Sequence, residues 1–159
     1  MPSARRAIQQ GDEDWMQRAI DRCKEAVAAG HAPFAACVVR ENDLLSCEHN
    51  LVDAMHDPTA HAEILAIRAA AERLGTHDLD GCVLYTTCEP CPMCFTAAHF
   101  ARISRIVYGA TIGDAALAGF DQLPVFASQL KLMGRSPVEL SAELMRDACV
   151  AVMTGRVRP

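Results

Sequence analysis

Residues 57–63 read Asp-Pro-Thr-Ala-His-Ala-Glu, and residues 88–94 read Cys-Glu-Pro-Cys-Pro-Met-Cys. Each stretch opens a run with helical spacing, and the second follows an expected strand over 82–87. Proline fits the first turn of a helix, where a backbone N–H has no partner within the helix. Strands that alternate with helices over short connections predict a layered α/β sheet with parallel neighbouring strands.

The rest of the chain supplies further helices and strands around these two stretches. An N-terminal helix with apolar residues three or four apart begins at Asp12 or Asp14 and ends at Gly30. A Ser-Pro-Val-Glu sequence at 136–139 is a capping box, which predicts a terminal helix over 137–154. The other expected elements are strands 34–39 and 44–48, which form an antiparallel hairpin, helix 59–74, strand 82–87, helix 92–101, strand 103–108, and a loop with short helical or strand pieces over 113–134.

The composition is that of an ordinary globular protein with an acidic balance. The 159 residues include 15 Lys and Arg against 20 Asp and Glu, so the net charge is −5, and 51% are hydrophobic. This length predicts one domain over residues 1–159, of which residues 1–11 form a frayed leader. The acidic balance argues against broad binding to nucleic acid. We find no apolar run that spans a bilayer and no secretion signal, so we expect no membrane contact and a cytoplasmic location.

Three side chains in the two stretches have the chemistry of a metal site. Cys91 and Cys94 form a Cys-x-x-Cys pair that opens a helix, where the helix dipole lowers the thiol pKa and favours metal binding. His61 supplies a nitrogen ligand if the strands bring the two helix starts together at the carboxyl edge of the sheet. Three protein ligands with an open fourth position are typical of catalytic zinc, whereas structural zinc sites have four. We therefore expect one zinc ion per subunit.

Glu63 lies two residues after the expected histidine ligand and completes a catalytic pattern. Zinc lowers the pKa of water to about 7, and the resulting nucleophile needs a group that moves its proton. The order His-x-Glu followed by Pro-Cys-x-x-Cys is typical of zinc deaminases, in which the glutamate is an acid and base rather than a ligand. A structural zinc site or a thioredoxin-like redox site is the alternative. A four-cysteine zinc site needs a second cysteine pair at a distance, which the chain lacks, and a redox site has no use for the histidine and the glutamate.

The chain has eight cysteines, of which only two belong to the expected ligand set. Cys88 adjoins the ligands, and we expect it to be a core thiol or a neighbour of the ligands rather than a third sulfur ligand. The other five are expected to be small apolar residues in a reduced interior. They are Cys23, Cys37, Cys47, Cys82 and Cys149.

From about residue 15 to residue 121, the sequence resembles the cytidine deaminase superfamily, and within it the bacterial guanine deaminases and tRNA adenosine deaminases. The stretch 57–63 is common to that branch. Cys88 before Glu-Pro-Cys is similar to guanine deaminases, whereas tRNA adenosine deaminases usually have leucine there. Segments 114–116 and 118–121 also resemble a guanine deaminase loop. The resemblance implies a three-layer α/β/α fold with a mixed central sheet of about five strands, and it implies a homodimer.

The same resemblance implies which residues contact the substrate. Asn50 would hydrogen-bond the base, Phe34 would line its pocket, and the backbone N–H of Ala62 would help to hold it. Asp114 in the similar loop is also expected to be a substrate contact. At Gln122, guanine deaminases tend to have an aspartate that accepts hydrogen bonds from guanine. An amide both donates and accepts, so the complementarity to guanine is weakened at this position.

The sequence therefore predicts a zinc-dependent hydrolytic deaminase, which acts on C–N bonds in cyclic amidines. The expected substrate is a small aminated heterocycle, a free nucleobase such as guanine, and ammonia is released. Water activated by zinc would attack the ring carbon that bears the amino group, while Glu63 carries a proton to the ring nitrogen and then to the leaving amine. The alternatives are cytosine or a triazine-type base, then the adenosine of a tRNA, and lastly a zinc-stabilised interaction module without catalysis.

Overall fold

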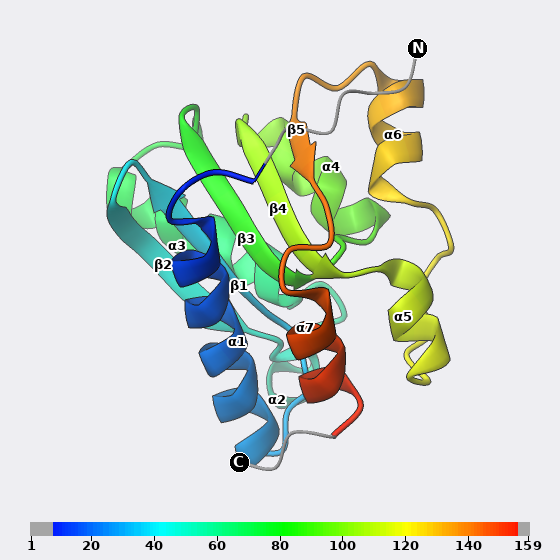
Figure 1. The fold of residues 1–159 in the computed structure, drawn as a ribbon. Coiled ribbons are helices and arrows are strands. Elements are labelled where there is room, and N and C mark those ends of the chain that lie inside the picture. Colours follow the sequence, from blue (N-terminus) through cyan, green and yellow to red (C-terminus); the bar gives the residue numbers. More distant parts are fainter. Residues whose placement is uncertain (1–7, 156–159) are drawn as a thin grey trace.

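The computed structural model describes residues 8–155, and a mixed five-stranded sheet forms its centre (Figure 1). The strands are β1 (Ala35–Arg40), β2 (Asp43–His49), β3 (Cys82–Cys88), β4 (Arg105–Ala110) and β5 (Glu139–Ser141). They lie in the order β2-β1-β3-β4-β5. β1 is antiparallel to both of its neighbours, whereas β4 is parallel to β3 and to β5. Most of the expected leader, residues 1–7, lies outside the described residues.

Helices cover both faces of the sheet and complete three layers. They are α1 (Asp12–Ala28), α2 (Val52–Met55), α3 (Ala62–Leu74), α4 (Pro92–Phe100), α5 (Ile112–Leu117), α6 (Ala127–Gly134) and α7 (Arg146–Met153). Figure 1 shows α1 and α7 over one face, and α3 and α4 over the other. The predicted α/β/α architecture with a mixed sheet of five strands is confirmed. Within residues 8–155, none of the helices combines the length and the apolar character that a membrane crossing requires.

β1 is buried on both faces, which explains its continuous apolar sequence. Ala36 and Val38 pack in one core with α3, while Cys37 and Val39 pack in the other with α1. None of the four is more than 2% exposed. Because side chains alternate along a strand, a strand between two helical layers needs apolar residues at every position.

The strand order brings two helix starts to one edge of the sheet. β2 and β3 are both antiparallel to β1, which lies between them, so they point in the same direction. The chain leaves β2 and reaches α3 after the short α2, and it leaves β3 and enters α4. The N-termini of α3 and α4 therefore lie at the same carboxyl edge, although β2 and β3 are not neighbours.

Helix α3 begins later than the predicted start at residue 59. Asp57 does not cap it, because the Asp57 Oδ1 accepts hydrogen bonds from the backbone N–H and the hydroxyl of Thr59, at 2.8 and 2.7 Å. An Asp side chain often forms such a turn with its own chain two residues on. The N-cap is instead His61, and Ala62 is the first helical residue.

The predicted terminal helix over 137–154 is wrong in its first half. Part of this stretch forms β5, which pairs in parallel with β4, and only α7 is helical. Val138 and Leu140 are 2% and 6% exposed and belong to the core on the α3 side. Strand pairing and the burial of these two side chains outweigh the local capping pattern.

Asp12 is a buried anchor rather than the cap of α1, whose N-cap is Gly11. The Asp12 carboxylate accepts hydrogen bonds from the Arg105 guanidinium at 2.6 and 3.0 Å and from the Tyr85 hydroxyl at 2.8 Å. Burial raises the pKa of Asp12, but these hydrogen bonds outweigh it and leave the pKa below its ordinary value. The side chains of Asp12 and Arg105 are at most 3% exposed, and their ion pair holds α1 against β4. Removal of either partner would leave the other as a buried, unpaired charge.

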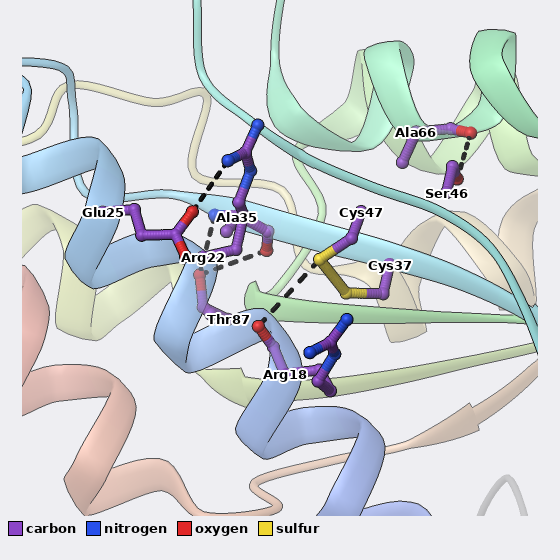
Figure 2. Close-up of a disulfide and its surroundings, with 9 residues drawn as sticks. All are labelled: Arg18, Arg22, Glu25, Ala35, Cys37, Ser46, Cys47, Ala66 and Thr87. Carbon is purple, nitrogen blue, oxygen red and sulfur yellow. Dashed lines mark hydrogen bonds and ion pairs between the residues drawn. A yellow bond between two sulfur atoms is a disulfide. The ribbon is translucent and has the colours of Figure 1, made fainter.

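Cys37 and Cys47 are joined by a disulfide, which corrects the expectation that both are reduced (Figure 2). They are direct partners in the β1–β2 register, with Cα atoms 4.1 Å apart. The Cys47 sulfur also lies 3.9 Å from the backbone oxygen of Arg18 in α1. Only the hairpin register places the two residues opposite each other, so their spacing in the sequence did not identify the pair.

We expect six thiols to react with a thiol reagent when the unreduced protein is unfolded in denaturant with a chelator, because six of the eight cysteines are free. After reduction, eight should react. A Cys47→Ser variant is the control: it should give seven reactive thiols before reduction, because Cys37 loses its partner. Eight reactive thiols in the unreduced wild-type protein would contradict the pairing.

Candidate metal centre and active site

The predicted metal ligands stand at the starts of two helices. His61 is the N-cap of α3, and Cys91 is the N-cap of α4, with Pro92 at the first helical position. Cys94 follows in the first turn of α4 and is buried. Both N-caps have extended backbone conformations, which turn the chain into the helix. The positive ends of two helix dipoles therefore meet beside the three side chains.

The three side chains fit a tetrahedral zinc ion. Their ligand atoms all lie within 4.8 Å of one another. The His61 Nδ1 is 3.7 Å from the Cys91 Sγ and 3.6 Å from the Cys94 Sγ. Zinc bonds of about 2.0–2.1 Å to nitrogen and about 2.3 Å to sulfur, at the tetrahedral angle, separate these atoms by about 3.6 Å. The structure thus brings the predicted ligands together with spacing that suits zinc.

The two cysteine ligands differ in their affinity for a proton. A hydrogen bond from Cys94 is the largest cause that lowers the pKa of Cys91 to about 4, and the contact with His61 lowers it further. The same bond is the largest cause that raises the pKa of Cys94, to which burial and Glu63 add. A metal ion binds the thiolate, so metal binding displaces the Cys94 proton.

Glu63 lies beside the ligands in the first turn of α3 and is 6% exposed. Its Oε2 is 3.5 Å from the Cys94 Sγ, and its Oε1 is 3.3 Å from the Thr86 hydroxyl. Burial is the largest cause that raises the pKa of the Glu63 carboxyl. A buried carboxyl with a raised pKa next to a metal is suited to take up and release protons at neutral pH.

A cavity of about 350 Å³ opens over the ligands, a volume that suits a small ligand. Of the predicted site residues, the lining includes Phe34, Asn50, His61, Glu63, Cys91 and Gln122. It also includes Glu89 and Phe120, which sequence reasoning did not single out as site residues. The Phe120 ring meets the Phe34 ring edge to face, with centroids 5.0 Å apart. The loop resemblance over 118–121 was the one signal that pointed to this segment.

Two amide side chains give the cavity its hydrogen-bonding character. The Asn50 Oδ1 accepts from the backbone N–H of Val52 at 3.1 Å, which leaves the Asn50 NH₂ group as the part that can donate a hydrogen bond. The Gln122 Oε1 is buried and has no hydrogen-bond partner among residues 8–155. A buried acceptor without a partner is costly, and a ligand N–H would satisfy it.

Three other residues that drew attention in the sequence lie elsewhere or take other roles. Asp114 does not line the cavity, because its carboxylate accepts hydrogen bonds from Arg146 at 2.7 and 2.8 Å and caps α5. Ala62 is fully buried, and its N–H is the first of α3, without a carbonyl partner in the helix. Cys88 lines the cavity outside the ligand cluster, and burial raises its pKa well above the ordinary value.

Hydrolytic zinc deaminases require three protein ligands, an open fourth position and a carboxylate that is not itself a ligand, and this protein is of that class. The family model for the cytidine and deoxycytidylate deaminase zinc-binding region matches residues 9–110. The chain belongs to this family. It is therefore an enzyme that uses zinc and water to break a C–N bond.

Proteins similar to this chain include guanine deaminases and tRNA adenosine deaminases. The guanine deaminase of Bacillus subtilis is 46% identical over 110 residues, which span 69% of this chain and 70% of that protein. The tRNA-specific adenosine deaminase of Aquifex aeolicus is 43% identical over 100 residues, which span 63% of this chain and 66% of that protein. A mutant protein solved in complex with 8-azaguanine superimposes with a TM-score of 0.84 and 30% identity, over 91% of this chain and 82% of its own.

Proposed function

We propose that the protein hydrolyses the C–N bond between the ring and the amino group of free guanine and releases ammonia. The observation that carries this proposal is the unpaired Gln122 oxygen in a small cavity directly over the zinc ligands. Guanine is a planar base with N–H groups that can donate to this oxygen and carbonyl or ring-nitrogen acceptors for the Asn50 NH₂ group. Similarity to a guanine deaminase and to a protein that binds 8-azaguanine supports the choice of base.

The charges around the cavity favour a free base over a tRNA. The described residues that line it include the acids Asp53, Glu89 and Asp121 but no Lys or Arg. Proteins that bind nucleic acid use Lys and Arg to neutralise phosphates, and that term supplies much of their affinity. The acidic surroundings suit a neutral heterocycle and disfavour the backbone of an anticodon loop.

The aromatic pair of the cavity supports a flat substrate. Phe34 precedes β1, and Phe120 lies in the loop after α5, so two distant segments supply the rings. An aromatic ring offers a heterocycle a stacking face, which is tolerant of the identity of the base. A cytosine or triazine-type base is the second candidate, because the Gln122 amide pairs with any ring that offers a donor beside an acceptor.

The reaction replaces the amino group by a carbonyl oxygen that comes from water. His61, Cys91 and Cys94 would hold the zinc ion, which when bound would lower the pKa of water and supply a nucleophile at neutral pH. We propose that Glu63 takes a proton from the attacking water and gives it to the ring nitrogen. Glu63 then takes the second proton of that water, from the hydroxyl now bonded to the ring carbon, and gives it to the amine. The C–N bond breaks, the oxygen becomes the carbonyl, and ammonia leaves. The Ala62 N–H, at the start of α3, is the proposed backbone donor to the substrate.

Exposed apolar side chains support the further proposal of a homodimer. Phe100 in α4 and Leu132 and Met133 in α6 are 74%, 75% and 82% exposed. The helices α4 and α6 contact each other, and exposed apolar side chains on neighbouring helices are typical of protein–protein contacts. A cytoplasmic location is also proposed, because the metal site needs Cys91 and Cys94 as thiolates, while the full burial of Cys37 shields its disulfide with Cys47 from cellular thiols.

A panel of guanine, cytosine, ammeline and an adenosine-bearing tRNA anticodon stem tests the substrate proposal. The zinc-loaded protein should release ammonia fastest from guanine, by kcat/KM. Faster release from the tRNA stem would contradict the proposal, and absence of release from every member would contradict deamination of this substrate class.

Gln122→Asp should raise the ratio of guanine to cytosine activity by about tenfold or more, because a carboxylate accepts from guanine N–H groups and does not donate. Gln129→Glu is the matched control, since it adds the same charge to exposed α6 outside the cavity lining. A ratio that is unchanged in Gln122→Asp would remove Gln122 from the choice of base.

Glu63→Gln should keep one zinc ion per subunit and lower kcat by at least about 100-fold, because the amide cannot carry a proton. Zinc content by atomic absorption and turnover by ammonia release check this. Glu72→Gln, at an exposed position of the same helix, should match the wild type in both measurements. Loss of zinc from Glu63→Gln would show that Glu63 is a ligand instead.

Light scattering should give twice the mass of the chain for the wild type, and Met133→Glu should shift it to the mass of one chain, because a buried carboxylate opposes association. Ser128→Glu, at an exposed position of the same helix, is the control. A wild-type protein with the mass of one chain would contradict the homodimer.

A further inference from the structure

Glu89 is a buried carboxylate that neither the zinc site nor the proposed proton transfer uses. It follows the end of β3, is 3% exposed and lines the cavity. Its Oε2 accepts a hydrogen bond from the Ile112 N–H at 3.0 Å, and its Oε1 accepts one from the Ala127 N–H at 2.8 Å. Each oxygen therefore already has a backbone partner, which a buried carboxylate needs.

The two donors are the first residues of two different helices. Ile112 begins α5 and Ala127 begins α6. The first N–H groups of a helix have no partner within it, and a negative charge there is favoured by the helix dipole. The segment 113–126 runs between these two donors, so one carboxylate holds both of its ends.

This segment supplies one wall of the cavity, through residues 120–122. The ion pair between Asp114 and Arg146 fixes only the first turn of α5. Farther along, Phe120 meets Phe34 edge to face, and the next apolar residue, Leu123, is 68% exposed. Ala115 and Phe120 pack in the core on the α1 side, whereas no residue of 121–126 belongs to either core. The position of the wall beyond Phe120 therefore depends strongly on how the ends of the segment are held.

We propose that Glu89 is a positioning residue, which sets the substrate-facing wall of the cavity by holding both ends of segment 113–126. It acts through Phe120 and Gln122, so its loss weakens substrate binding and leaves zinc binding and proton transfer intact. The inference rests on the proposed function for the identity of the substrate. The conformational order of segment 113–126, in contrast, can be measured by hydrogen–deuterium exchange without any substrate.

Glu89→Gln tests the proposal, because one carboxylate oxygen becomes an NH₂ group that cannot accept from a backbone N–H. KM for the best base of the panel should rise about tenfold or more, while kcat changes by less than about twofold and zinc stays at one per subunit. Hydrogen–deuterium exchange should become faster in peptides that cover 113–127 and stay unchanged in β3. Glu13→Gln, at an exposed position of α1, is the control for the lost charge.

Ala127→Pro removes one of the two donors and leaves Glu89 in place. Proline is favoured at the first helical position, and the preceding Phe126 already has the extended backbone that proline requires. This variant should raise KM and speed exchange over 113–127 in the same direction as Glu89→Gln. The double variant should be less than additive, because both changes break the same contact.

Unchanged KM and unchanged exchange in either variant would overturn the inference, and so would loss of zinc from Glu89→Gln. If Glu89→Gln does not fold, Ala127→Pro alone decides through the same two measurements. If no base of the panel is deaminated, the proposed function fails, but the exchange measurement still supports or overturns the role of Glu89.

Discussion

The convergence of two helix N-termini at one edge of the sheet is the constraint on which the site depends. β1 lies between β2 and β3 and forces them to point the same way, so α3 and α4 start side by side. His61 and Cys91 are the N-caps of these helices, so the ligand geometry follows from where each helix begins. The helix dipoles favour the thiolates that the metal needs.

The two halves of the cavity are built by different means. The residues around the zinc site come from two short stretches of sequence. The first turn of a helix fixes the position of each stretch. The proposed substrate half combines Phe34 and Asn50 with segment 113–126, and the Glu89 carboxylate accepts hydrogen bonds from the residues that flank this segment. Buried carboxylates recur in this fold as connectors, since Asp12 likewise joins α1 to β4 through Arg105.

The clustering of His61, Cys91 and Cys94 was predictable from the sequence because each of the two stretches places its side chains at the start of a helix. The contacts that the sequence did not reveal depend on distant segments. Asp12 carries a local capping pattern but pairs with Arg105, and 137–154 carries a helix pattern but its first half joins the sheet. The Cys37–Cys47 disulfide likewise needed the hairpin register, which a list of cysteine positions does not contain.

X-ray absorption at the zinc edge of the purified protein tests most directly whether three protein ligands hold a zinc ion with an open fourth position. Two sulfur atoms at about 2.3 Å and two nitrogen or oxygen atoms at about 2.0–2.1 Å are expected, from Cys91, Cys94, His61 and one exchangeable oxygen. The oxygen should be displaced by an inhibitory anion or base. Three or four sulfur atoms around zinc would contradict this site and would make Cys88 a ligand.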